Sequence, residues 1–470
     1  MRAFALAAFI ALAACDRGGV PRVTALDSGA ENKTVGAIDR TALDSNVAPC
    51  TDFYAYACGG WIQSRPIPED EGMWSRSFHE ITLRNEIELR AILEGDATRP
   101  PANEPQSNAL GDFYATCSDQ TAIAARGNHE LIALLDTVDT SDADHAAATS
   151  AHLRRLGIAS FFAFEPEPDL NDARLAGAVL RQPPLTLSEE RYGEAAERAA
   201  LVSHVTKMFE LVGDSQARAV VEAADAADVE QKLVGAFESR AVFHDSTSDP
   251  LIADGISLPR IAAKFPWNSY FKTLAVDPPL ATHVATPHYL TALGNLFAQM
   301  LQTTRQREAL RSLFRWQLLR TFGPLVSSAL AAEDFTFTRR LTGATKIAPR
   351  WKQCVRAAEA TFADALSVPF AKRMLDARAA DRARIVGDSM QHAMHDEIAA
   401  LPWMDVATRA TALAKLDRVA IEIGTAETRV DYPVLVLGRT SFLSNLVRTR
   451  EFAANRELMS MRVGSSRLSR

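Results

Sequence analysis

The sequence predicts a mainly α-helical protein, and two patterns support this fold class. Apolar residues recur along most of the chain at the three- and four-residue spacing of an amphipathic helix. Proline and glycine lie between these segments, where they interrupt helices. A β-rich run at Tyr432–Leu437, bounded by proline and glycine, predicts a short extended segment near the C-terminus.

The first helices are expected on the two sides of a proline loop. Segment Ser75–Glu94 places its apolar side chains on one stripe, and Gly95 marks its expected end. Arg99–Pro101 predicts the loop. Ser107 is the expected N-cap of the next helix, which runs to Cys117.

Three further segments predict helices in the rest of the chain. Tyr192–Glu238 is rich in Ala, Val, Glu and Leu and lacks proline, which predicts one or two long helices. Arg305–Phe322 has leucine and phenylalanine on one face and is expected to end at Gly323-Pro324. Asp405 is the expected N-cap of a helix through Leu416.

Composition excludes two classes of protein. The 470 residues are 47% hydrophobic and 23% charged, which suits a globular chain with a large core. The net charge of −7 and the even spread of arginine argue against a nucleic-acid partner, which would require a concentrated basic surface. No apolar run beyond the N-terminus reaches the roughly 18 residues of a transmembrane helix.

The N-terminus has the pattern of an export signal. Met1-Arg2 precedes the apolar stretch Ala3–Ala14, which is too short to span a bilayer. Leu12–Cys15 resembles a bacterial lipobox, in which the cysteine is lipidated; a plain secretory signal is the alternative. We therefore predict a lipoprotein signal peptide at 1–14 and a lipid anchor on Cys15. Residues 15–44 are predicted to be a flexible tether, with the protein held at the membrane of a bacterial cell envelope, in the periplasm or at the outer membrane.

The remaining cysteines agree with export. Cys50, Cys58, Cys117 and Cys354 make an even number, which indicates disulfides in an exported protein. Four cysteines permit three connectivities, and their spacing alone does not choose among them.

An aromatic, cysteine-containing string follows the tether. Pro49–Trp61 reads PCTDFYAYACGGW, and Pro66–Pro68 reads PIP. This string resembles the start of the neprilysin and endothelin-converting-enzyme family of zinc metallopeptidases. Met73 is a departure, because many members carry an arginine before the aromatic that here is Trp74.

The resemblance continues from about Asp44 to about Arg462 and is weakest between His129 and Leu185. Four later segments are similar to the family: Asp112–Cys117, Phe265–Trp267, Pro349–Val355 and Trp403–Asp405. The resemblance implies that residues 45–425 form the family's large multi-helix N-terminal lobe. Residues 426–470 would be a truncated connection toward a missing catalytic lobe.

The resemblance also implies a disulfide pattern. The family pairs the cysteines that correspond to Cys117 and Cys354. This bridge would close a loop of more than roughly 200 residues, which the chain-entropy model values at about 4–5 kcal/mol. The family's partners for Cys50 and Cys58 lie in the catalytic lobe, so these two are expected to be unpaired or paired with each other.

The zinc-binding residues of the family are not found in the chain. The family uses a His-Glu-x-x-His helix, whose histidines bind zinc and whose glutamate is the general base. None of the ten histidines lies in such a sequence. His392 and His395 are one helical turn apart, but they are interpreted as part of a solvated face. No catalytic or metal residue is therefore predicted, and zinc is expected only in the complete family enzyme.

These observations predict a substrate-enclosing lobe of a metallopeptidase that is inactive by itself. Arg462–Arg470 is rich in serine and arginine, and a frameshift, an early stop or a split gene would each produce such an ending. Peptides would be substrates only if a catalytic lobe completed the enzyme. Two alternatives are one half of a split peptidase and an envelope-tethered peptide-binding or scaffold protein.

Overall fold

The computed structural model describes residues 40–101, 106–168, 176–238, 251–253, 257–276, 282–424 and 435–461. The predicted signal peptide, Cys15, most of the tether and the tail from residue 462 lie outside these ranges. The described residues fall into two compact units. One comprises those up to Leu83 together with Thr342–Lys346, and the other comprises those of Arg84–Leu341 and Ile347–Arg470.

The first unit contains the family-like string. Its elements are η1 (Arg40–Ala42) and α2 (Phe53–Ser64), and α2 begins at Asp52, whose side chain accepts a hydrogen bond from the Ala55 amide. Gly60 lies against the η1 turn, because a Cβ atom there would come within 2.6 Å of the Thr41 carbonyl oxygen. The indole of Trp61 donates to Glu80 over 2.9 Å. The string therefore forms a helix with one small-residue face against η1.

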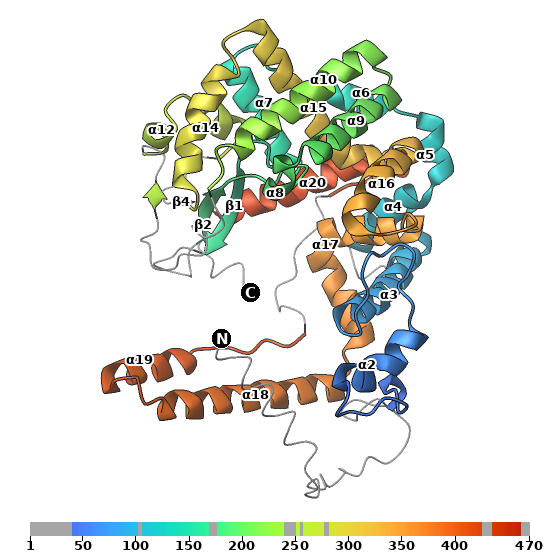
Figure 1. The fold of residues 1–470 in the computed structure, drawn as a ribbon, viewed down its shortest axis with the longest axis vertical. Helices are drawn as coiled ribbons and strands as arrows, with labels where there is room; N and C mark the ends of the chain where they lie inside the picture. The colour runs from blue at the N-terminus through green and yellow to red at the C-terminus, as the bar shows by residue number, and fades with distance from the viewer. Residues whose placement is uncertain are drawn as a thin grey trace, which may run out of the picture. The chain divides into compact units, whose positions relative to one another are not determined.

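The second unit is built from helices, and Figure 1 shows their course. Two helices cross the boundary with the first unit: α3 (Phe78–Thr98) begins there and α16 (Ser328–Thr342) ends there. The others are α4 (Gln106–Ser118), α5 (Gln120–Arg126), α6 (His129–Leu135), α7 (Ala143–Arg155), α8 (Glu189–Gly193), α9 (Ala195–Leu211), α10 (Gln216–Val234), α12 (Leu258–Ile261), α13 (Trp267–Leu274), α14 (Pro287–Gln299), α15 (Thr304–Val326), α17 (Arg350–Met374), α18 (Ala377–Ala400), α19 (Val406–Leu416) and α20 (Phe442–Ser460). The mainly α-helical prediction is confirmed.

Several predicted helix ends are confirmed and others are wrong. Asp405 caps α19 and accepts a hydrogen bond from the Thr408 amide over 2.8 Å. Helix α3 passes through Gly95 and ends at Thr98, because one glycine costs only about 1 kcal/mol in a helix. Ser107 is buried inside α4 and does not cap it. Helix α15 continues through Pro324 to Val326, since the proline lies close enough to the helix end to interrupt little of it.

A small sheet was not predicted. Its strands are β1 (Ala163–Pro168), β2 (Ala176–Arg181), β3 (Ile252–Ala253) and β4 (Thr282–Val284), in the order β1-β2-β4-β3. Strands β1 and β2 are antiparallel, β2 and β4 are parallel, and β3 and β4 are antiparallel. Of the run that predicted an extended segment, Tyr432–Val434 lie outside the described residues. Leu435–Leu437 are described and form no strand.

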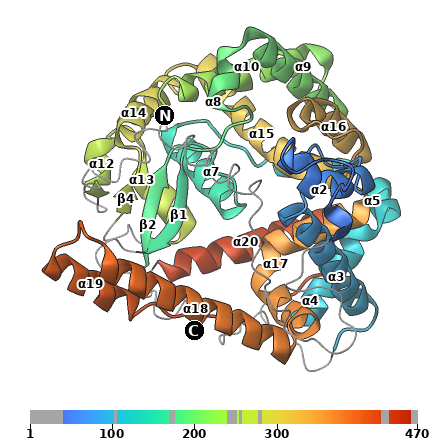
Figure 2. The same ribbon diagram turned by 60° about the horizontal axis from the view of Figure 1, so that its bottom comes forward.

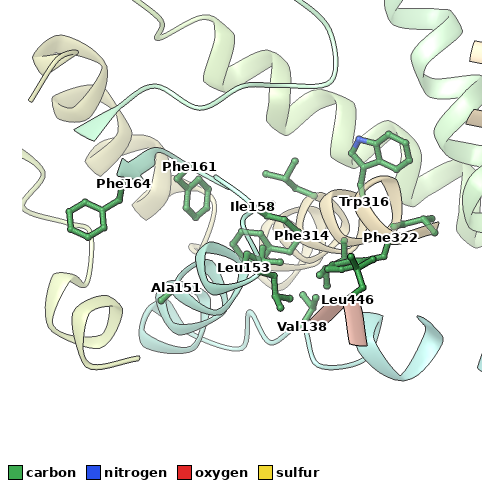
Figure 3. Packing of buried hydrophobic residues seen from close by; sticks show 14 of the residues in the cluster. Val138, Ala151, Leu153, Ile158, Phe161, Phe164, Phe314, Trp316, Phe322 and Leu446 are labelled. Atoms are coloured by element: carbon green, nitrogen blue, oxygen red, sulfur yellow. The ribbon is translucent and has the colours of Figure 1, made fainter. Parts of the chain in front are cut away.

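The core of the second unit joins residues from distant parts of the sequence. Phe161 makes edge-to-face contacts with Phe297 and Phe314, with 5.4 Å between ring centroids in each pair. Figure 3 shows Phe161 and Phe314 in this core, together with Leu446 from α20. Helix α20 contacts α4, α7, α15, α17 and β1. Helix α20 lies within residues 426–470, and their role as a connection toward a catalytic lobe stays a prediction.

Helices α18 and α19 form an antiparallel pair, side by side in Figure 2. The Gln391 amide donates to the carbonyl oxygens of Leu416 and Val419 over 3.2 and 3.3 Å. A Cβ atom at Gly387 would lie 3.0 Å from Ile421, so the small residue permits close packing. No residue of α18 is buried. The pair is therefore held by contacts along one side and leaves most of its surface exposed.

Candidate functional site

The described residues do not form a zinc site. Among them, no group of three or more His, Cys, Asp or Glu side chains is placed to hold a metal ion. His392 is exposed, with its Nδ1 atom 2.7 Å from the Asp388 carbonyl oxygen of its own helix. His395 is also exposed and lies 3.5 Å from Asp396. Neither histidine belongs to a group of three metal ligands among the described residues, so the two do not fit a zinc site.

Cys117 and Cys354, the pair implied by the resemblance, are joined by a disulfide between α4 and α17. The S–S distance is 2.08 Å, and both residues are completely buried. Arg350 lies next to this bridge, where its Nε atom donates to the Cys117 carbonyl oxygen over 2.8 Å. Burial lowers the pKa of Arg350 to about 10. The bridge therefore connects two core helices across a sequence separation of 237 residues.

The other two cysteines, Cys50 and Cys58, are not bonded to each other. Cys58 is a free thiol and is half-buried. It is therefore not bonded to Cys50, and the predicted mutual pairing is not formed. Sequence position could not show this, because pairing depends on which sulfur atoms meet in space.

A buried ionic cluster lies between α10 and α15, and the sequence did not reveal it. The guanidinium of Arg315 donates to Asp214 over 2.8 Å and also contacts Glu222. The Arg315 side chain is only 5% exposed, and those of Asp214 and Glu222 are 9% and 11% exposed. Arg218 completes the cluster from a position nearer the solvent. Two arginines thus offset the charges of two carboxylates in the helical core.

A second buried cluster centres on Glu230 of α10. Thr186 donates to the Glu230 carboxylate over 2.9 Å, and the Tyr192 hydroxyl also donates to it. Burial raises the pKa of Glu230 and also that of Tyr192. The Arg320 guanidinium lies 4.0 Å from Glu230 and donates to Thr186. These groups satisfy one another, so we interpret the cluster as part of the packing of α8, α10 and α15.

An arginine-lined cavity of about 540 Å³ opens between α7, α15, α17 and α20. Arg154, Arg356 and Arg450 line it together with Glu457. The rest of the lining is mainly alanine and leucine from α15, α17 and α20. This site could not be predicted from the sequence, because the arginines come from three helices that are far apart in the chain.

The segment with the family-like string presents aromatic side chains to solvent. Phe53 and Tyr54 at the start of α2 are 68% and 69% exposed. Met73, where the resemblance departs from the family, is 66% exposed. Among the described residues, every helix is too short or too polar to cross a lipid bilayer.

Comparison with family models and known proteins agrees with this architecture. Residues 49–426 match the model described as peptidase family M13. The endothelin-converting enzyme homolog of Locusta migratoria is 21% identical over 83% of this chain and 56% of its own length. Human endothelin-converting enzyme 1 is 22% identical over 82% of this chain and 51% of its own length. The chain thus spans about half the length of these relatives.

Solved structures show the same fold. The zinc metalloprotease Zmp1 of Mycobacterium tuberculosis, solved with an inhibitor, superposes with a TM-score of 0.81 and 27% identity. The match covers 90% of this chain and 64% of that one. PepO from Lactobacillus rhamnosis has a TM-score of 0.71 and 20% identity, over 87% of this chain and 65% of its own. At that identity the likeness concerns the fold alone.

Proposed function

The chain belongs to peptidase family M13, and from this premise we propose that it is the helical lobe that helps to enclose peptide substrates in a zinc metallopeptidase. The match over residues 49–426 is the observation that carries the proposal. The likeness to an inhibitor-bound zinc metalloprotease, over 90% of this chain, supports it. The helical residues would shape the space around a peptide and limit which peptides enter.

We infer that the zinc chemistry is supplied by residues outside these 470. A bound zinc ion supplies Lewis-acid activation of water or of a carbonyl group. The sequence contains no His-Glu-x-x-His, and the described residues include no group of donors for a metal ion. We therefore propose that another stretch of polypeptide supplies the zinc ligands, and that this chain does not cleave peptides by itself.

The exposed apolar surface of the α18–α19 pair is evidence for a second polypeptide that covers it. Val386, Met390 and Met394 repeat at four-residue spacing on α18 and are 58%, 63% and 53% exposed. Val406 of α19 is 81% exposed. Exposed apolar rows of this kind mark surfaces that another part of a protein covers. Since the relatives are about twice as long as the part that matches, the zinc-bearing polypeptide is the occupant we propose.

A peptidase assay tests this proposal. The purified 470-residue chain, supplied with zinc, is incubated with a library of short peptides, and the products are measured by mass spectrometry. We expect no hydrolysis that a chelator abolishes, because the sequence has no His-Glu-x-x-His and no group of metal ligands was found among the described residues. The matched control is the same chain with two exposed histidines of α18 changed, His392→Ala and His395→Ala, which should behave identically. Chelator-sensitive cleavage by the unmodified chain contradicts the proposal.

We also propose that Cys15 anchors the chain to a membrane in the envelope of a bacterial cell, as the lipobox-like Leu12–Cys15 suggests. Labelling of expressing bacteria with a radioactive fatty acid should mark the chain, and Cys15→Ser should abolish the label. Cys58→Ser, a matched cysteine change, should leave it intact. Because a thioether-linked lipid occupies the sulfur atom, an N-terminal peptide isolated with Cys15 in a disulfide contradicts this proposal.

A further inference from the structure

The arginine-lined cavity has the size and composition of a ligand site. Its volume of about 540 Å³ lies in the range of roughly 300–1,000 Å³ that is usual for small-molecule pockets. Leu325, Ala357, Leu446 and Ala454 supply apolar walls. Such pockets combine a mainly apolar lining with a few polar groups that orient the ligand. In this cavity the cationic polar groups are three arginines.

Two of the three arginines have carboxylate partners. Arg154 is 6% exposed, and its Nη2 atom lies 2.8 Å from Glu457, while its Nε atom donates to the Phe164 carbonyl oxygen. Arg356 donates from Nε to Glu86 over 2.7 Å. These partners offset the charges of Arg154 and Arg356, so neither arginine needs a ligand for neutralisation.

The third arginine, Arg450, contacts a carbonyl oxygen and an aromatic ring. Its Nη1 atom donates to the Leu156 carbonyl oxygen over 3.1 Å, and its guanidinium lies 5.0 Å from the centroid of the Phe322 ring. Among the described residues, no carboxylate forms an ion pair with it. Burial lowers the pKa of Arg450. The Arg450 side chain is half-buried, so its guanidinium has lost part of its hydration, and a bound anion would replace that loss.

We propose that this cavity binds a molecule with one carboxylate on an apolar body, held by a charge-assisted hydrogen bond to Arg450. One uncompensated arginine matches a single negative charge, whereas a phosphate group carries about −1.5 to −2 at neutral pH. The apolar walls match a hydrocarbon or an aliphatic side chain. Two sources supply this chemistry: the C-terminal carboxylate of an apolar peptide and a fatty acid. The inference does not depend on the proposed peptidase role.

Calorimetric titration of the purified 470-residue chain tests the site. The probes are N-acetyl-leucyl-leucine, its C-terminal amide, octanoate and inorganic phosphate. We expect the peptide acid or octanoate to bind, and whichever of them binds identifies the source. We expect the amide, which has no charge, to bind at least tenfold more weakly than the acid, and phosphate to bind more weakly than the carboxylate that binds. Binding of neither carboxylate overturns the proposal, as do equal binding of acid and amide and preferential binding of phosphate.

Variants locate the binding. Arg450→Met should weaken carboxylate binding at least tenfold. Arg448→Met is the matched control, because Arg448 is on the same helix but is exposed and donates to Val436 outside the cavity. Ala360→Trp is a second test of the location. Ala360 is an exposed residue of the cavity lining, and a large side chain there narrows the cavity while leaving Arg450 in place. Unchanged binding in Ala360→Trp, or in a folded Arg450→Met variant, contradicts the assignment.

Discussion

Replacing Cys117 and Cys354 together with alanine is expected to lower the free energy of unfolding by about 4–5 kcal/mol. The bridge spans 237 residues, so its removal releases a very long loop in the unfolded chain. Both sulfur atoms are buried between α4 and α17, and alanine there also leaves a small void. Urea unfolding followed by circular dichroism measures the change as a lower midpoint.

Cys58→Ala is the control for this experiment. Cys58 is a free, half-buried thiol in the first unit, so its loss should change the unfolding free energy by less than about 1 kcal/mol. A strong reductant should reproduce the effect of the double variant in the unmodified chain. Equal stability of the double variant and the unmodified chain would show that the bridge does not constrain the unfolded state.

Replacing Arg315 with methionine is expected to cost about 3–5 kcal/mol. The change leaves Asp214 and Glu222 buried without their main cationic partner, and an uncompensated buried charge is strongly destabilising. Methionine has a similar length, so the packing against α10 is largely kept. Denaturant unfolding at neutral pH gives the loss directly.

Arg218→Met provides the comparison, because Arg218 contacts the same two carboxylates. Its side chain is 48% exposed, and exposed ion pairs contribute about 0–1 kcal/mol. We therefore expect a small effect. If the two variants lose equal stability, burial is not the reason that Arg315 matters. If Arg315→Met is as stable as the unmodified chain, the ionic cluster contributes nothing to the fold.

Predictions of helices and their ends from the sequence were correct where the interactions that set them are local. Asp405 was predicted as an N-cap because its side chain needs only the amide three residues later, and the structure shows that bond. Tyr192–Glu238 was predicted as one or two helices, and α9 and α10 occupy it with a break at Gly213. Gly213 has a φ of 104°, a backbone angle that favours glycine.

The predictions failed where burial outweighed local preference. Gly95 and Pro324 carry strong helix-ending signals, yet α3 and α15 run past them because their buried faces pack against the core. Strands β3 and β4 of the sheet were missed because they are only two and three residues long. Such short strands show no period that sequence reading can detect.

The amino-acid sequence alone was enough for the helical class, the resemblance to a zinc metallopeptidase family and, through that resemblance, the Cys117–Cys354 pair. These rest on residue types at set positions along the chain. Only the tertiary structure could assign Arg315 to its two carboxylates, which are 101 and 93 residues away in sequence. The same is true of Arg450, which donates to the carbonyl oxygen of Leu156, 294 residues away in sequence. The partners of a buried charge are decided by which helices meet in space, and spacing along a chain does not record that.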